Sequence, residues 1–228
     1  MNKIDITMTA TIRPDIVNKT LESFCKNMFS DRDRYNLILN VDPIGEETLR
    51  KNVYKVARKY FNSIILNYPS TPGFTKAVIW CWSQTSSNYV FHLEDDWELL
   101  IPIDIDAMIK ILDSNPTLVS LRLNKQKTGK NILYKKNGFL PYPKISLNPT
   151  LFNGRFIQRI HPLMDVNLNP EKQLRVNNTP RGKYLSKFTH GIYTRESVRQ
   201  IVKDIGREWM NKSRYTKKIG FMNWENKN

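Results

Sequence analysis

Segments typical of β-strands alternate with segments typical of α-helices over the first hundred residues, and this alternation restricts the possible folds more than any other feature. Runs rich in β-branched and aromatic residues, as strands favour, cover residues 4–10, 35–41, 61–66 and 89–93. Apolar residues at helical spacing follow three of these runs, over residues 14–24, 46–60 and 74–84. Strands that alternate with helices build βαβ units, so we predict an α/β fold with a mostly parallel sheet and helices on both faces.

The pattern is weaker after residue 100. There we predict a helix over residues 103–115, a strand over 117–123, a long loop or irregular hairpin up to 143, mixed turn and strand over 146–157, a short helix opened by residues 169–172 and a helix over 194–205. The chain has 228 residues, enough for one large domain with a substantial core. No internal repeat or low-complexity linker divides the sequence, so we expect a single domain.

Three consecutive carboxylates, Glu94, Asp95 and Asp96, directly follow the strand pattern at residues 89–93. Ligands of open α/β sheets bind beyond the carboxyl ends of the strands, which is where these side chains are expected. Two carboxylates 4 Å apart repel each other by roughly 4 kcal/mol at an effective dielectric of 20, and a divalent cation removes this repulsion. Oxygen ligands suit Mg²⁺ or Mn²⁺. The triplet therefore indicates a metal site for a phosphorylated substrate, with a solvated turn as the alternative.

The chain is strongly basic, with 36 Lys and Arg residues against 21 Asp and Glu residues and a net charge of +15. The excess is concentrated in residues 121–144, which contain no acidic residue, and in the C-terminal part of the chain. Such asymmetry favours a polyanionic partner, such as nucleic acid, anionic lipid or an acidic glycan. The alternative is that many of these lysines only keep the protein soluble.

The composition favours a globular protein of the cytoplasm. Hydrophobic residues make up 40% of the chain, which excludes a disordered protein, and no run of residues is long and apolar enough to span a membrane. The N-terminus enters a strand pattern at once, without the apolar region of a signal peptide. Cys25 and Cys81 lie among apolar neighbours and are expected to be buried, reduced thiols. We therefore expect a cytoplasmic location, in the host cytoplasm if the protein is viral.

Four motifs at the predicted strand ends resemble the donor site of GT-A-fold glycosyltransferases, family 2 in particular. Thr9-Ala-Thr-Ile-Arg-Pro14 resembles the first strand and turn that hold the nucleotide, and Val41-Asp42-Pro43 resembles the second strand end, which contacts the base. Gly73-Phe74-Thr75-Lys76-Ala77 resembles the turn and helix before the metal strand. Glu94-Asp95-Asp96 matches the acidic motif of the family in its Glu-Asp-Asp variant. The resemblance is good over residues 4–125 and weaker to about residue 200.

The resemblance implies a single GT-A domain in which residues 1–125 bind the nucleotide sugar and residues 126–228 bind the acceptor and carry the basic C-terminal part. It implies that Asp96 holds Mn²⁺ or Mg²⁺ and that Asp95 contacts the ribose or sugar. Arg13 or Lys76 would add positive charge at the diphosphate. The donor-site residues expected from the resemblance are Thr9, Thr11, Arg13, Asp42, Gly73, Lys76, Glu94, Asp95 and Trp97.

The acceptor side has weaker matches and leaves more alternatives open. Glu171, which precedes a short helix, matches the position of the family's catalytic base, and Asp165 is the alternative base. His190 in Thr189-His190-Gly191 resembles a C-terminal metal ligand, with a structural role as the alternative. His92 and His161 compete for that role, although His92 is more simply read as a core histidine. Trp97 is placed either to stack on a sugar or to pack in the core.

The resemblance implies a metal-dependent hexosyltransferase. A sugar would leave a nucleotide diphosphate, most simply uridine diphosphate, and a single base opposite the leaving group would give inversion at the anomeric carbon. The net charge favours DNA as the acceptor, for instance a hydroxymethylated base in viral DNA. A cell-surface glycan or lipid-linked sugar is the alternative acceptor. A non-catalytic, basic nucleic-acid-binding protein is the alternative to an enzyme.

Overall fold

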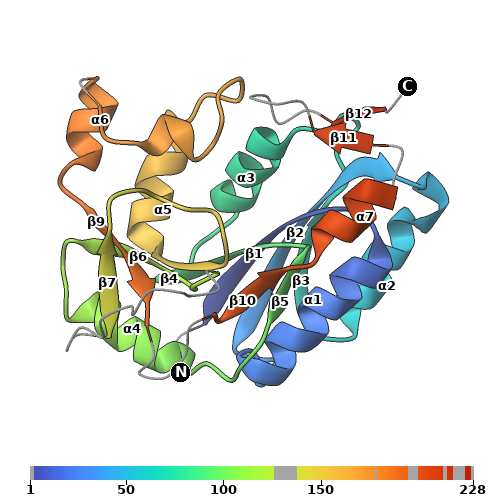
Figure 1. Ribbon diagram of the computed structural model, residues 1–228, viewed down its shortest axis with the longest axis horizontal. Coiled ribbons are helices and arrows are strands. Elements are labelled where there is room, and N and C mark those ends of the chain that lie inside the picture. Colours follow the sequence, from blue (N-terminus) through green and yellow to red (C-terminus); the bar gives the residue numbers. More distant parts are fainter. Residues whose placement is uncertain are drawn as a thin grey trace.

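An eight-stranded sheet runs through the computed structural model, which describes residues 3–125, 138–177, 179–194, 200–212, 215–217 and 224–226 (Figure 1). Its strands are β1 (Ile4–Ile12), β2 (Tyr35–Gly45), β3 (Ser63–Asn67), β4 (Tyr89–Glu94), β6 (Leu118–Arg122), β7 (Phe139–Tyr142), β8 (Thr150–Asn153) and β9 (Thr189–Tyr193). They lie in the order β3-β2-β1-β4-β8-β6-β9-β7. The strands β3, β2, β1 and β4 run parallel, as do β6 and β9, whereas β8 and β7 are antiparallel to their neighbours.

Helices cover both faces of this sheet, and a separate hydrophobic core lies on each face (Figure 1). One core contains side chains of α1 (Pro14–Asn27), α2 (Arg50–Arg58) and α4 (Ile105–Asp113). The second core contains side chains of α3 (Phe74–Ser83) and α5 (Gly154–Ile160). The predicted α/β class and the mostly parallel sheet are therefore confirmed.

Strand β1 is central and is buried along its whole length, so its polar side chains need partners within the protein. Its odd-numbered positions carry Asp5, Thr7, Thr9 and Thr11, all on the face opposite the large apolar residues. Asp5 Oδ2 accepts hydrogen bonds from the backbone nitrogens of Ser86 and Ser87 at 2.7 and 2.8 Å. Asp5 thereby fixes the turn that leads into β4, the strand that carries the acidic motif.

The first half of the chain follows the predicted order of elements with small changes at their ends. The predicted helix over residues 46–60 is a short 3-10 turn, Glu47–Leu49, followed by α2. Strand β2 continues beyond Asp42 to Gly45, where the chain has a φ of 126° that favours glycine. The predicted elements over 103–115 and 117–123 appear as α4 and β6.

The predicted helix over residues 194–205 is wrong where the structure describes it. Val202–Asp204 form strand β10, which pairs antiparallel with β5 (Trp97–Leu99) just after the acidic motif. Residues 195–199 lie outside the described ranges, as do residues 126–137, where a loop or hairpin was expected. The mixed turn and strand expected over 146–157 contains β8 and the unpredicted helix α5. A second unpredicted helix, α7 (Gly206–Lys212), follows β10.

Other short elements complete the described part of the chain. The short helix expected near residue 171 is present as a 3-10 turn, η3 (Lys172–Leu174). Two further helical segments, η2 (His161–Leu163) and α6 (Pro180–Leu185), lie on either side of it, and β11 (Tyr215–Lys217) pairs with β12 (Trp224–Asn226). Among the described residues, no helix has both the length and the apolar character needed to cross a bilayer.

Two buried histidines should make the protein less stable in mild acid. His92 Nδ1 lies 3.0 Å from Thr7 Oγ1, and His190 Nδ1 lies 2.7 Å from Ser120 Oγ. Burial lowers the pKa of His92 to about 3 and that of His190 to about 4, whereas an unfolded histidine titrates near 6.5. The unfolded chain therefore binds more protons than the folded protein below about pH 6.5, and acid favours unfolding.

We expect the free energy of unfolding to fall as the pH drops from 7 to 5, by up to about 1.4 kcal/mol per pH unit for each histidine. Urea unfolding at pH 7, 6 and 5 measures this slope. His190→Gln, which keeps a polar group beside Ser120, should reduce the slope by the share of one histidine. If the free energy of unfolding has the same slope against pH in the variant and in the wild type, burial of His190 does not contribute to that slope.

Candidate active site

Three parallel strands bring polar side chains to one edge of the sheet. Thr9 in β1 lies level with Asn40 in β2 and with Glu94 in β4. Thr9 is buried, and its Oγ1 has no hydrogen-bond partner among the described residues. These positions are at the carboxyl ends of the parallel strands, where ligands of such sheets bind. The structure thus places the predicted donor-site residues of β1 and β4 at the expected edge.

Asp42 fixes the turn before α3. Its Oδ1 accepts a hydrogen bond from Asn40 Nδ2 at 2.8 Å, and its Oδ2 accepts one from the backbone nitrogen of Gly73 at 3.0 Å. Burial raises the pKa of this carboxyl above its usual value, although the two hydrogen bonds oppose the shift. Lys76 is exposed, and its side chain lies over Gly73. Asn40 belongs to the site and was not predicted from the sequence.

Asp95, the middle carboxylate of the motif, is hydrogen-bonded to groups within the protein. Its Oδ2 accepts hydrogen bonds from the backbone nitrogen of Thr11 at 2.9 Å and from Arg13 Nε at 2.8 Å. Its Oδ1 accepts one from Arg13 Nη2 at 2.5 Å, and its side chain is only 4% exposed. Thr20 Oγ1 also donates to the backbone oxygen of Asp95 at 2.7 Å. Asp95 therefore joins the end of β1 to α1.

Arg13 binds Asp96 as well as Asp95. Its Nη2 lies 2.9 Å from Asp96 Oδ2, and the guanidinium is 4% exposed. Burial by itself would lower the pKa of Arg13, but the charges of the two carboxylates outweigh it and raise the pKa above its ordinary value. Arg13 is thus a buried counterion of the acidic motif, although the sequence suggested a role beside the diphosphate.

Glu94 and Asp96 are the two carboxylates of the motif that reach the surface. The side chain of Asp96 is 19% exposed, and Glu94 is half-buried. Glu94 Oε2 accepts a hydrogen bond from Trp97 Nε1 at 3.1 Å. Trp97 itself is buried, with Lys125 Nζ 5.6 Å from its ring, so the structure gives it the packing role rather than a sugar-stacking one.

The described residues fit a divalent metal only if the substrate supplies most of its ligands. No group of three or more His, Cys, Asp or Glu side chains among them is arranged to hold a metal ion. Mg²⁺ in phosphate-transfer sites is commonly held by one or two carboxylates, with substrate phosphates and water as the other ligands. Asp96, the partly exposed carboxylate at the strand end, suits that smaller role.

A small pocket joins the acidic motif to the acceptor side. Its volume is about 190 Å³, and it is lined by Phe74, Glu94, Leu147, Asn148, Asn169 and Glu171. Glu171 Oε1 accepts a hydrogen bond from the backbone nitrogen of Leu147 at 2.7 Å, which fixes the carboxylate at the pocket wall. Asn169 Oδ1 accepts one from the backbone nitrogen of Glu171 at 3.1 Å. Glu94 and the predicted base Glu171 therefore face one cavity, although 77 positions separate them in the sequence.

Two other predicted residues lie away from this pocket. Asp165, the alternative base, is exposed, and its Oδ1 accepts a hydrogen bond from the backbone nitrogen of Asn167 at 2.8 Å. His190 pairs with Ser120 in the strand register, and through β8 it lies level with Val90 rather than with the end of β4. Strand β9 is also three strands away from β4. The structure therefore does not bring His190 to Asp96.

The pocket also contains residues that sequence reasoning missed. Phe74 begins α3, and Asn148 and Asn169 lie in loops before β8 and η3. Asn169 carries a readable signal, because an asparagine before Pro170 and Glu171 is typical of the start of a short helix. Asn148 lies in Leu147-Asn-Pro-Thr-Leu-Phe152, which resembles an acceptor-side segment of the family, but this residue was not among the predicted site residues.

Comparison with known proteins gives matches among solved structures alone. No protein-family model and no curated protein sequence matches the chain. The mannosyltransferase PcManGT from Pyrobaculum calidifontis, solved with GDP-Man and Mn²⁺, has a TM-score of 0.63 and 10% identity over 90% of this chain and 57% of that chain. TarS residues 1–349 from S. aureus has a TM-score of 0.54 and 11% identity, over 90% of this chain and 61% of that chain.

The same TarS fragment, solved with UDP-GlcNAc, has a TM-score of 0.53 and 10% identity, over 88% of this chain and 58% of that chain. At this identity the likeness establishes the fold, and the chain has the GT-A fold expected from the sequence. It spans less than two thirds of the length of these proteins.

Proposed function

We propose that this protein is a glycosyltransferase that moves a sugar from a nucleotide diphosphate sugar to a hydroxyl acceptor. The observation that carries the proposal is the pocket in which Glu94 of the acidic motif and Glu171 of the acceptor side face each other at the end of a GT-A sheet. The structural neighbours support it, because PcManGT is solved with GDP-Man and TarS with UDP-GlcNAc. A uridine diphosphate sugar remains the simplest donor.

Asp96 is the residue proposed to hold Mn²⁺ or Mg²⁺, an ion that neutralises negative charge on a departing diphosphate. The mannosyltransferase solved with Mn²⁺ supports a metal of this kind. Arg13 binds both Asp95 and Asp96, and Asp96 is the more exposed of these two carboxylates, so it is the one proposed to interact with the donor side. Lys76, exposed beside Gly73, is the cation proposed to approach a diphosphate.

Glu171 is the proposed general base, because its carboxylate lines the pocket and Asp165 does not. A base takes the proton from the acceptor hydroxyl as the oxygen attacks the anomeric carbon. The hydrogen bond from the backbone nitrogen of Leu147 fixes the orientation of that carboxylate. One base on the acceptor side, opposite the leaving diphosphate, predicts inversion of the anomeric configuration.

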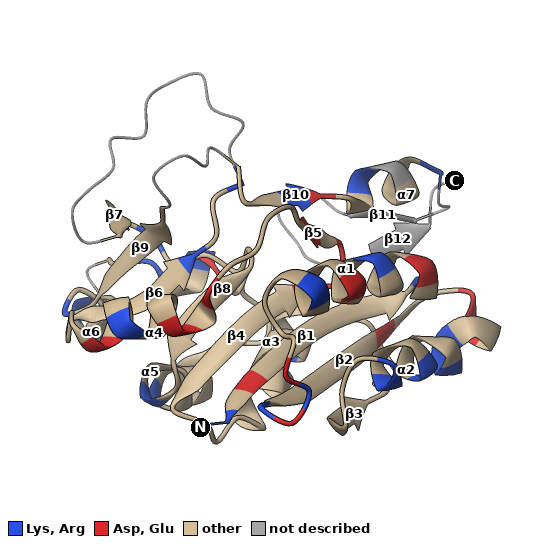
Figure 2. Cartoon of the chain, turned by 90° about the horizontal axis from the view of Figure 1, so that it is seen from below, with Lys and Arg blue, Asp and Glu red and all other residues tan. Residues whose placement is uncertain are grey.

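The pocket suits a hydroxyl-rich group. Two carboxylates accept hydrogen bonds, two carboxamides both donate and accept them, and the ring of Phe74 offers an apolar face. The net charge of +15 supports a polyanionic acceptor, such as a hydroxymethylated base in viral DNA. Figure 2 shows the described Lys and Arg positions spread over several helices, α1, α2 and α5 among them.

Turnover of a panel of nucleotide sugars, with and without Mn²⁺, tests the function. We expect one donor to be hydrolysed or transferred only when metal is present, and Asp96→Ala to lower that rate by at least 100-fold, the size of effect typical of a lost charge-stabilising group. Glu98→Ala, which removes a carboxylate that follows the motif, is the matched control and should keep most of the rate. If no donor turns over with any metal, the proposal is wrong.

The acceptor is identified by repeating the reaction at several salt concentrations. Binding of DNA weakens with a log–log slope near −0.9 per phosphate contact, so transfer to hydroxymethylated DNA should fall steeply with salt. Transfer to a neutral glycan should depend on salt only weakly. Transfer to a glycan without any transfer to DNA would rule out the DNA acceptor.

A further inference from the structure

The segment from β10 to α7 lies directly on the acidic motif. The backbone nitrogen of Ile205 donates a hydrogen bond to the backbone oxygen of Asp96 at 2.8 Å. Asp204 Oδ1 accepts one from the backbone nitrogen of Gly206 at 3.0 Å, where α7 begins. A Cβ atom on Gly206 would lie 2.3 Å from Asp96 Oδ2, so only glycine allows this approach. The first turn of α7 therefore packs against the Asp96 carboxylate.

Trp209, in the same first turn of α7, covers the guanidinium of Arg13. The ring centroid lies 5.1 Å from Arg13 Cζ, a distance at which the cation is attracted to the face of the indole. The same guanidinium binds both Asp95 and Asp96. Trp209 of α7 thus covers one side of the ion cluster that Arg13 forms with Asp95 and Asp96.

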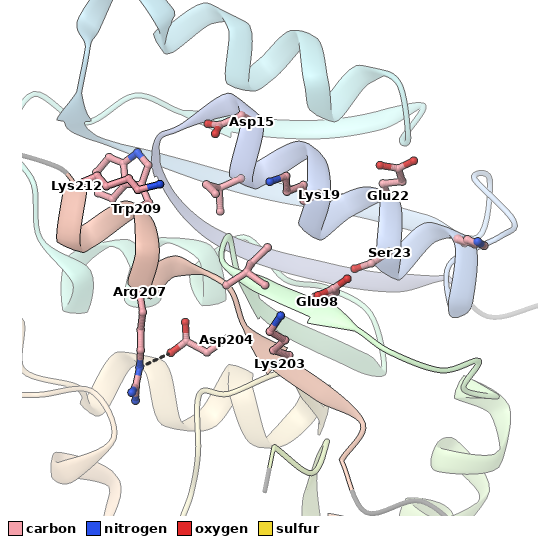
Figure 3. A pocket seen from close by; sticks show the side chains of 13 residues that line it. Asp15, Lys19, Glu22, Ser23, Glu98, Lys203, Asp204, Arg207, Trp209 and Lys212 are labelled. Atoms are coloured by element: carbon pink, nitrogen blue, oxygen red, sulfur yellow. Dashed lines mark ion pairs between the residues drawn. The ribbon is translucent and has the colours of Figure 1, made fainter. Parts of the chain in front are cut away.

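A wide cavity lies on another side of Trp209. Its volume is about 830 Å³, and Figure 3 shows it between α1, β10 and α7, with Trp209 in its wall. Charged side chains of both signs line it, among them Asp15, Lys19, Glu98, Lys203 and Lys212. A cavity of this size with a charged lining is polar and large enough to hold water. The indole of Trp209 therefore contacts both this cavity and the guanidinium of Arg13, whose side chain is only 4% exposed.

We propose that Trp209 is a positioning residue for the acidic motif. Its ring holds Arg13 and excludes water, and Arg13 in turn fixes the carboxylate of Asp96. Buried ion pairs keep one geometry when water is excluded, since the low dielectric strengthens each contact. The C-terminal segment is therefore part of the active site, although none of its described residues lines the small pocket. The catalytic side of this inference rests on the proposed role of Asp96 toward the donor.

Amide hydrogen exchange on the protein without ligands measures this positioning directly. The amide of Thr11 donates to Asp95 Oδ2 and the amide of Asp95 donates to the backbone oxygen of Thr9, so both report on the cluster. We expect Trp209→Ala to speed exchange at these amides at least tenfold and Trp209→Phe less than twofold. Gly206→Ala, which pushes a methyl group toward Asp96, should act like Trp209→Ala. Lys212→Ala, on the same helix, is the control and should change nothing.

Transfer activity provides the second measurement. For Trp209→Ala we expect kcat to fall about tenfold with less than a threefold change in the KM of the donor, and Trp209→Phe should restore most of kcat. Unchanged exchange at Thr11 and Asp95 in Trp209→Ala overturns the proposal, as does exchange that rises equally over the whole chain. If the wild type transfers no sugar, the proposed function fails, whereas the exchange result still decides whether Trp209 holds the cluster.

Discussion

Replacing Arg13 by methionine should lower the free energy of unfolding by about 3–5 kcal/mol, the cost of removing one partner of a buried ion pair. Methionine fills much of the same volume, so the loss comes from charge rather than from a cavity. Without the guanidinium, the buried carboxylate of Asp95 keeps, among the described residues, only the hydrogen bonds from Thr11, and it lies next to Asp96 in a site of low dielectric. Urea unfolding of the variant and the wild type measures the difference.

Two further variants separate this cause from a general loss of packing. Arg34→Met removes an arginine that pairs with Asp106, whose side chain is 48% exposed, and should cost at most about 1 kcal/mol. Combining Arg13→Met with Asp95→Leu removes both charges and should recover most of the stability lost in the single variant. If the double variant is as unstable as Arg13→Met, the ion pair is not the source of the effect.

Apart from the short strand β5, the order of strands and helices in the first 123 residues could be predicted, because each of the other elements shows the apolar pattern of a strand or of a helix. Strand β1 is buried on both faces and therefore reads as a continuous β-rich run, and α1 presents Ile16, Val17 and Phe24 at helical spacing. Such local patterns follow from the burial of one face or both faces of a strand or helix, and they are visible in the order of apolar and polar residues.

The predicted helix over residues 194–205 failed for a tertiary reason. Ile201 and Val202 are buried, and their spacing from Val198 also fits a helix face. In the structure Val202 pairs instead with Leu99 in β5, and that pairing is with a segment about one hundred residues earlier. Helix α5 was missed because Asn153-Gly154 reads as a turn. Asn153 Oδ1 in fact accepts a hydrogen bond from the backbone nitrogen of Phe156 and starts the helix.

The candidate site could be placed from the sequence, but the role of each carboxylate could not. Strand ends alone located Glu94, Asp95 and Asp96 at the correct edge. The counterion of Asp95 is Arg13. The sequence suggested instead that the side chain of Arg13 lies beside the diphosphate, so it did not show which of the three carboxylates has a partner within the protein. Likewise, Trp209 approaches Arg13 only because β10 pairs with β5, a contact with no local signal.

Glu171→Gln should lower kcat for sugar transfer by about 10²–10⁴-fold, the range expected when a general base is lost. Glutamine keeps the oxygen that accepts the hydrogen bond from the backbone nitrogen of Leu147, so the pocket wall should retain its shape. The amide cannot take a proton from the acceptor hydroxyl, and the barrier rises for that reason. Steady-state kinetics with saturating donor and acceptor measure kcat.

Donor affinity and the alternative base provide the controls for this prediction. The dissociation constant of the nucleotide diphosphate sugar should change less than threefold in Glu171→Gln, because the proposed base acts on the acceptor. Asp165→Asn should keep nearly the full kcat, since Asp165 is exposed and lies outside the pocket. A normal kcat in Glu171→Gln together with a large loss in Asp165→Asn would move the base to Asp165.

The anomeric configuration of the product tests the proposed position of Glu171 as the base. Under the proposed function, the acceptor hydroxyl and the donor sugar meet in the pocket of about 190 Å³ that Glu171 and Glu94 line, with the base on the acceptor side. Direct attack from that side inverts the anomeric carbon, and NMR of the first product formed reads its configuration. Retention would require either an enzyme nucleophile beside the sugar or attack by the acceptor on the face from which the diphosphate leaves. Glu94, the other carboxylate of this pocket, would then be the residue to replace next.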